Sequence, residues 1–126
     1  ACVKLGILYK GDYNKTMQKE ADKLFNTACE NNIASGCFEL AAIYYQGEII
    51  RKSLKKAKKL YEKACSLQNA SSCYNMGIIY QKGLKVEKDI TKALEYFNKS
   101  CSLKFKKGCL EYEKLLNSLT ETLKEN

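Results

Sequence analysis

The sequence contains no proline and no histidine among its 126 residues, and Arg51 is the sole arginine among 22 basic residues. Because proline breaks helices, its absence leaves helical segments uninterrupted. Without histidine, and without a Cys-x-x-Cys pair, the sequence offers neither a typical zinc site nor a base to activate a nucleophilic thiol. We therefore expect no metal, no cofactor and no catalytic residue.

Two further absences concern partners. Nucleic-acid-binding proteins rely on arginine for bidentate contacts to bases and phosphates, whereas the net charge of +8 here comes from lysines spread along the chain. No stretch approaches the 18 consecutive apolar residues that indicate a membrane-spanning helix. We interpret the lysines as solvated helix faces and expect neither nucleic-acid binding nor membrane insertion.

Cysteine, in contrast, recurs at a regular spacing. Six of the seven cysteines form pairs whose members are eight positions apart, and each pair begins 36 positions after the last. The pairs are Cys29 and Cys37, Cys65 and Cys73, and Cys101 and Cys109. A period of this length is typical of stacked supersecondary units and predicts a solenoid.

Two helical patterns repeat around the cysteines. After Cys37, the residues at offsets 3, 4 and 7 are Leu40, Ala41 and Tyr44, which share one helical face, and Gly47 then ends the pattern. The same arrangement starts at Cys2 and Cys73, with Gly11 and Gly83 as the ends, and at Cys109 without a glycine. Large aromatics in the second pattern, at positions 25, 61 and 97, are expected to fill the space opposite small residues at 6, 41 and 77.

The cysteine spacing also predicts the disulfides. Two residues eight apart on one helix lie about 12 Å apart, beyond the roughly 7 Å limit between bridged Cα atoms, so a turn must separate them. We predict that each pair forms one bridge across a helix hairpin. Cys2 has its partner position upstream of Ala1, so we interpret it as unpaired by truncation. The disulfides predict an oxidising compartment, which is the periplasm, the cell surface or the medium.

We expect residues 1–126 to form a single repeat domain. Its parts are a remnant of a truncated first repeat at 1–11, repeats at 16–47, 52–83 and 88–109, and a C-terminal capping helix at 110–126. An apolar stripe supports the cap: Tyr112, Leu115, Leu116, Leu119 and Leu123. An exposed partner-binding helix is the alternative interpretation of this stripe.

The segment from Cys37 to Gly47, followed after ten residues by Ala57 to Cys65, resembles the Sel1-like repeat, a relative of the tetratricopeptide repeat. Paired cysteines in place of the usual alanines resemble the Helicobacter cysteine-rich protein family. The resemblance implies an all-α fold, a right-handed α/α superhelical solenoid of disulfide-stapled helix hairpins. It also implies a secreted or periplasmic scaffold whose concave surface binds a protein or peptide.

By resemblance to tetratricopeptide repeats, the glycine-ended helices line the groove with residues that the core does not use. Carried onto this sequence, these are Ser35, Phe38, Ala42 and Tyr45, and then Ser71, Tyr74, Ile78 and Gln81. We expect Phe38, Tyr45 and Tyr74 to be the aromatic anchors, because interface energy concentrates in such side chains. The alternative is that these three rings belong to the core between repeats.

Some cysteine-rich relatives carry a penicillin-binding or β-lactamase label, which implies a β-lactam or peptidoglycan-related ligand as the alternative function. Ser53 to Lys56 matches Ser-x-x-Lys, but the Ser-Asp-Asn and Lys-Thr-Gly elements are absent. The chain is also about half the size that such enzymes need. We interpret Ser53 as a helix cap and expect no enzymatic activity.

Overall fold

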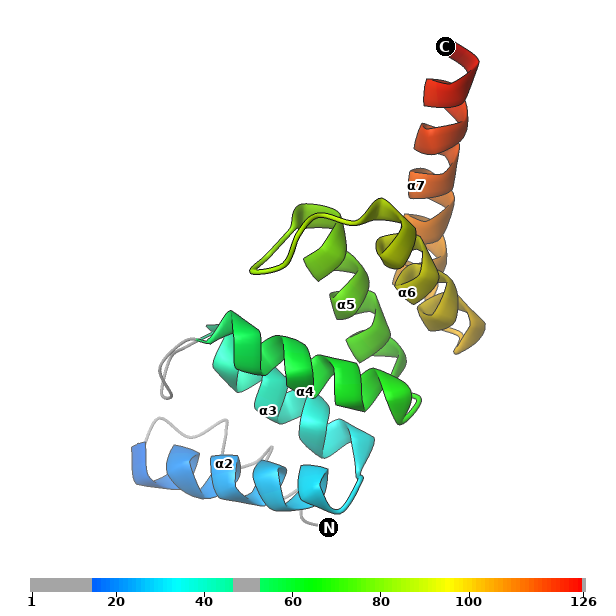
Figure 1. Ribbon diagram of the computed structural model, residues 1–126. Helices are drawn as coiled ribbons and strands as arrows, with labels where there is room; N and C mark the ends of the chain where they lie inside the picture. Colours follow the sequence, from blue (N-terminus) through cyan, green and yellow to red (C-terminus); the bar gives the residue numbers. More distant parts are fainter. Residues whose placement is uncertain (1–14, 47–52, 126) are drawn as a thin grey trace. The chain divides into compact units, whose positions relative to one another are not determined.

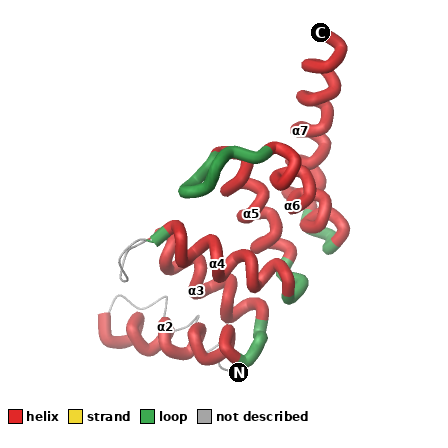
Figure 2. Tube along the Cα trace, viewed as in Figure 1, coloured by secondary structure: helices red, strands yellow, loops and turns green. Residues whose placement is uncertain are grey.

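The computed structural model describes residues 15–46 and 53–125, and all the regular secondary structure within these ranges is helical (Figures 1 and 2). The helices are α2 (Lys15–Glu30), α3 (Ala34–Gln46), α4 (Leu54–Ser66), α5 (Ala70–Lys82), α6 (Ile90–Ser102) and α7 (Lys106–Glu125). The all-α prediction is therefore confirmed. The expectations for Cys2, Gly11, the 1–11 remnant and Gly47 lie outside the described residues.

The chain divides into two compact units, residues 1–69 and residues 70–126. In the first unit, α3 packs against both α2 and α4. In the second unit, α6 packs against both α5 and α7. Each unit therefore has a central helix with a neighbour on either side.

A tight backbone turn ends the first helix of each hairpin. At the end of α2, Asn32 adopts a left-handed φ of 62°, and the N–H of Ile33 donates to the Ala28 carbonyl at 2.9 Å. This closure satisfies carbonyls that the helix end leaves unpaired. It recurs 36 and 72 positions later, where Gln68 and Lys104 both have a φ of 72°. The period in the sequence is therefore also a period in backbone conformation.

The glycine predicted to end α5 does so. Gly83 has a φ of 71°, and the N–H of Leu84 donates to the Ile79 carbonyl at 2.9 Å. This is the same closure as at Asn32, placed at the other end of the hairpin. Glycine accommodates the left-handed conformation because it has no Cβ.

Disulfides hold the hairpins together where their helices approach most closely. Bridges join Cys29 to Cys37 and Cys101 to Cys109, with Cα atoms 4.5 Å and 4.4 Å apart. Cys65 and Cys73 are also disulfide-bonded. A glycine precedes Cys37, and a Cβ placed on this Gly36 would lie 2.6 Å from the Ala28 Cβ. Only a minimal residue fits at this crossing.

Large aromatic rings fill the space opposite small residues, as the sequence predicts. Phe97 is fully buried, and a Cβ added at Gly77 would lie 2.5 Å from two of its ring carbons. In the first unit, Phe25 is fully buried in a cluster with Ala21 and Leu40. A lysine adds a polar contact there, since Lys63 Nζ donates to the Cys29 carbonyl at the end of α2, at 2.9 Å. Positive charge is favourable at this end of a helix.

Removing a bridge should destabilise its hairpin by a predictable amount. A closed loop of nine residues is worth about 2.5 kcal/mol in the chain-entropy model. We expect the double substitution Cys101→Ala and Cys109→Ala to lower the free energy of unfolding by roughly this amount, measured by urea denaturation. Adding reductant to the wild type should lower its stability further than it lowers that of the variant. Equal sensitivity of both proteins to reductant would contradict the structural role of this bridge.

Asp22 on α2 should make stability depend on pH. Burial raises the pKa of this carboxyl, and its Oδ1 atom is buried without a hydrogen-bond donor. Because the folded state favours the protonated form, the contribution of Asp22 to stability increases as the pH falls from neutral toward about 4. We expect Asp22→Asn to raise the melting temperature at pH 7, and the gain to shrink toward pH 4. Glu20→Gln, at an exposed position two residues away, is the matched control and should change little.

Candidate interaction surface

The first row of expected partner-binding residues lies on α3. Ser35 and Tyr45 are exposed, Tyr45 with 37% of its surface, whereas Phe38 and Ala42 are half-buried. The rings of Phe38 and Tyr45 both contact the buried ring of Tyr61 on α4, with centroids 6.0 Å and 6.5 Å apart. Phe38 also packs against the cluster around the Cys29–Cys37 bridge. In this row, Tyr45 is the aromatic residue most accessible to a partner.

The second row lies on α5 and is less accessible. Ser71, Tyr74, Ile78 and Gln81 are all half-buried. The Tyr74 ring contacts Phe97 at 5.7 Å and Phe105 at 5.5 Å, which makes it part of the packing of the second unit. Burial, and then the negative charge of Glu111, raise the pKa of the Tyr74 hydroxyl, so this group stays neutral at physiological pH.

A third row follows from the same period, and the sequence analysis did not include it. Adding 36 to the α5 positions gives Lys107, Leu110, Lys114 and Asn117 on α7. Leu110 has 55% of its surface exposed, although it occupies the place that Phe38 and Tyr74 take in their repeats. The signal that could have identified it was the cysteine period itself, continued through Cys109.

The apolar stripe expected to form a cap also lies on α7. Tyr112, Leu115 and Leu119 are half-buried, and Leu116 has 41% of its surface exposed. Within its unit, α7 packs against α6 and, over a smaller area, against α5. The capping role stays a prediction.

Ser53 is a helix cap, as interpreted from the sequence. Its Oγ accepts a hydrogen bond from the N–H of Lys56 at 3.2 Å, and its own N–H donates to the Tyr44 carbonyl at 3.0 Å. Asp89 makes the same two bonds in the next repeat, to Lys92 and Tyr80, with the same φ of −143° and ψ of 100°. An aspartate therefore does at position 89 what the serine does at position 53.

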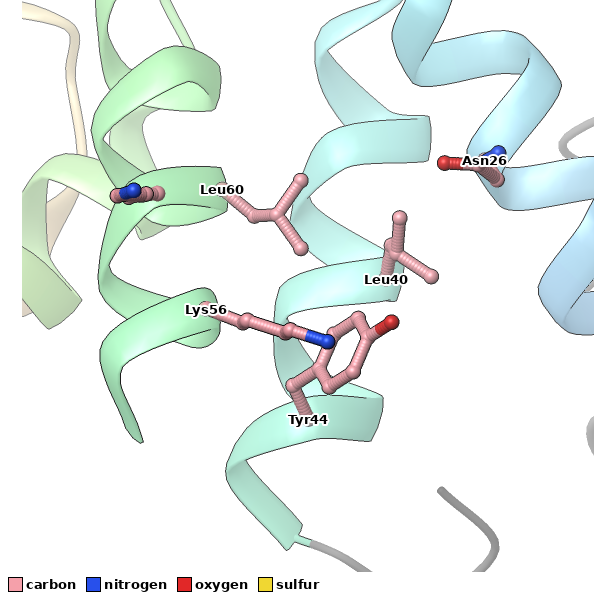
Figure 3. A pocket seen from close by; sticks show the side chains of 6 residues that line it. Asn26, Leu40, Tyr44, Lys56 and Leu60 are labelled. Carbon is pink, nitrogen blue, oxygen red and sulfur yellow. The ribbon is translucent and has the colours of Figure 1, made fainter. Parts of the chain in front are cut away.

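Two pockets lie elsewhere on the units. One of about 270 Å³ lies between α2, α3 and α4 (Figure 3). The other, of about 470 Å³, lies beside the α5–α6 connection and is lined mainly by polar residues, including Lys88 and Asp89. Sequence analysis predicted neither pocket.

Within the described residues, no cluster of three or more potential ligands is arranged to hold a metal, and no helix is long and apolar enough to cross a bilayer.

Repeated helix hairpins with a 36-residue period and a recurring left-handed closure at the turn within each hairpin define a helical repeat protein of the tetratricopeptide-like class. Residues 34–69 and 70–105 match the Sel1 repeat, over more than half of the chain. The chain belongs to the Sel1 repeat family, whose members are scaffolds that bind protein partners. No curated protein matches the sequence.

Solved structures agree with this assignment. The chain is 28% identical to Helicobacter pylori cysteine rich protein B, with a TM-score of 0.73 and 86% of each chain covered. A Sel1 repeat protein from Oxalobacter formigenes is 20% identical with a TM-score of 0.79, over 90% of this chain and 46% of that one. A protective antigen of uropathogenic Escherichia coli is 22% identical with a TM-score of 0.81, over 90% of this chain and 25% of that one. The expected solenoid class and the resemblance to the cysteine-rich proteins are confirmed.

The repeat supplies a direct test of the role of Ser53. We expect Ser53→Ala to cost about 1 kcal/mol of stability through loss of the cap, and Ser53→Asp to retain it, as Asp89 does. Urea denaturation of both variants measures this. A parallel assay with a chromogenic β-lactam should show no turnover that depends on residue 53. Hydrolysis that both substitutions abolish would contradict the assignment of Ser53 as a cap alone.

Proposed function

We propose that this chain is a periplasmic or secreted scaffold that binds a protein or peptide partner along the inner surface of its solenoid. The proposed contact residues are those of the rows on α3, α5 and α7, with Tyr45 and Leu110 as the main anchors. The observation that supports this most strongly is that both side chains are large and exposed, and that each belongs to one of the rows defined by the repeat period. Such side chains contribute most of the energy in protein interfaces.

The half-buried rings in the same rows support a rigid surface rather than direct contact. Phe38 and Tyr74 pack against aromatic residues of the neighbouring helix. They hold α3 and α5 in place while the exposed members of the rows remain available. A surface that is ordered before binding loses less conformational entropy when the partner arrives.

The proposed location rests on the disulfides. Bridges of this kind persist in oxidising compartments and are rare where glutathione keeps thiols reduced. Six bonded cysteines in a chain of 126 residues therefore support a protein that works outside the cytoplasm. The similarity to Helicobacter pylori cysteine rich protein B is consistent with this proposal.

Site-specific photo-crosslinking tests the proposed surface. A benzophenone amino acid would replace Tyr45 or Leu110, and, in control variants, Lys55 or Glu95, which are exposed on α4 and α6. After irradiation with extract of the cell envelope, we expect one discrete crosslinked protein from the Tyr45 and Leu110 positions and none from the controls. In a competition assay against that protein, Tyr45→Ala should weaken binding by about tenfold and leave helicity unchanged. Equal crosslinking from all four positions would rule out a specific surface.

A further inference from the structure

The pocket between α2, α3 and α4 contains none of the residues in the proposed partner-binding rows. Leu60 extends from α4 toward α3, Leu40 lies on α3, Lys56 extends along the Tyr44 ring, and Asn26 comes from α2 on the far side (Figure 3). Leu40 is almost fully buried and belongs to the core. Lys59 completes the lining. The pocket thus combines an apolar base, one aromatic ring and two ammonium groups.

In the next repeat a pocket also lies beside the equivalent tyrosine and lysine, but the residue at a third position differs. Tyr80 and Lys92 correspond to Tyr44 and Lys56, and the ammonium-to-ring distance is 5.1 Å there and 5.4 Å here. At the position equivalent to Leu60, however, that repeat has Tyr96. Its ring stacks on the Tyr80 ring at 5.8 Å with an interplanar angle of 5°. One repeat therefore supplies its own aromatic ring at this place.

In the first unit, Leu60 takes the position equivalent to Tyr96 and leaves the space beside the Tyr44 ring open. Leucine lacks the ring that Tyr96 contributes, and the pocket of about 270 Å³ has roughly the lower limit of volume for a small-molecule site. Tyr44 keeps only part of its surface buried, so its ring is available for stacking. The space suits a ligand with one aromatic ring, in the offset arrangement that such rings prefer.

The charge of the residues that line the pocket indicates which charge the ligand carries. Lys59 stands where the next repeat has Glu95, so the substitution that opens the pocket is accompanied by a reversal of charge. No acidic residue lines the pocket, and neither Lys56 nor Lys59 forms an ion pair with another described residue. The carboxylate of Glu30 on α2 accepts a hydrogen bond from the Asn26 amide at 3.2 Å. Two ammonium groups that have no carboxylate partner among the described residues, beside an apolar base, favour an anion.

We propose that this pocket binds a small aromatic carboxylate, whose ring stacks on Tyr44 in the place that Tyr96 takes in the next repeat and whose carboxylate lies between Lys56 and Lys59. Lys56 contributes to both parts, because its ammonium group contacts the ring of Tyr44 and attracts the ligand's charge. The ligand is too small to be a folded partner, so this site is additional to the proposed scaffold function.

Titration with 4-hydroxyphenylacetate tests the proposal. We expect saturable binding with a dissociation constant on the order of 1 mM, as befits a ligand of this size. Its uncharged amide and the saturated analogue cyclohexylacetate should each bind at least about tenfold more weakly. Nuclear magnetic resonance titration at neutral pH would follow the shifts of residues around Tyr44. Equal affinity for the amide or for the saturated acid would overturn the assigned ligand class, and no saturation by the aromatic acid would overturn the site.

The substitutions that test the site introduce the residues found at the equivalent positions of the next repeat. Leu60→Tyr should abolish binding by filling the pocket, and Lys59→Glu should weaken it by at least about tenfold by reversing the charge. Lys55→Glu makes the same change of net charge on an exposed position of α4 outside the pocket and should leave binding unchanged. If Leu60→Tyr loses helicity, Lys59→Glu and Lys55→Glu still decide the question. Equal loss in these two lysine variants would show non-specific attraction and overturn the proposal.

The two sites can be tested independently. Tyr45→Ala should leave binding of the aromatic acid unchanged, since Tyr45 does not line the pocket. Conversely, Lys59→Glu should leave crosslinking from Tyr45 unchanged. A shared loss in both assays would indicate one continuous site and contradict the separation proposed here.

Discussion

The close crossing of two helices at each disulfide is the constraint on which the rest of the structure depends. With Cα atoms only 4.5 Å and 4.4 Å apart, the helices leave room for little more than hydrogen atoms beside the bridge. This is why Gly36 faces Ala28 and why Gly108 faces Ser100, whose Oγ donates to the Ala70 carbonyl within the second unit. A larger residue at either glycine would force the helices apart and strain the bridge. The small residues at the crossing therefore permit the close approach of the helices that the disulfide bridges require.

The close crossing determines which part of each helix face packs inside its hairpin. The left-handed residue at the turn sends the chain back along the helix it has just left, and the bridge fixes where the two helices meet. Aromatic rings then fill the wider part of the hairpin, with Phe25 and Phe97 fully buried. Units of 69 and 57 residues bury little apolar surface by themselves, so covalent links are an effective source of stability. Side chains that serve neither the crossing nor the ring packing are free to differ between repeats.

The features that the sequence predicted correctly are the ones encoded locally or periodically. The cysteine spacing required a turn, Gly83 marked a helix end, and Ser53 preceded a lysine-rich helix in the manner of a cap; the structure has all three. The sequence left open whether Tyr74 is an anchor or part of the core, because its packing depends partly on Phe105, which lies in a turn outside both helical patterns. The exposure of Leu110 likewise reflects which neighbours its helix has rather than the residue type. The pocket at Leu60 exists because leucine is smaller than the tyrosine of the next repeat, and such an empty space can be recognised only once the surrounding helices are placed.

The differences between equivalent positions indicate how such a repeat acquires distinct sites without changing its backbone. The caps at Ser53 and Asp89 have the same backbone angles and the same hydrogen bonds, so α4 and α6 begin in the same way in both repeats. In one, Tyr96 stacks on Tyr80 and completes the packing. In the other, Leu60 and Lys59 leave an open and positively charged space. The bridges and caps recur in both repeats, whereas the residues that line the pocket differ between them. Surface side chains of a repeat can therefore change while the elements that fix its backbone stay the same.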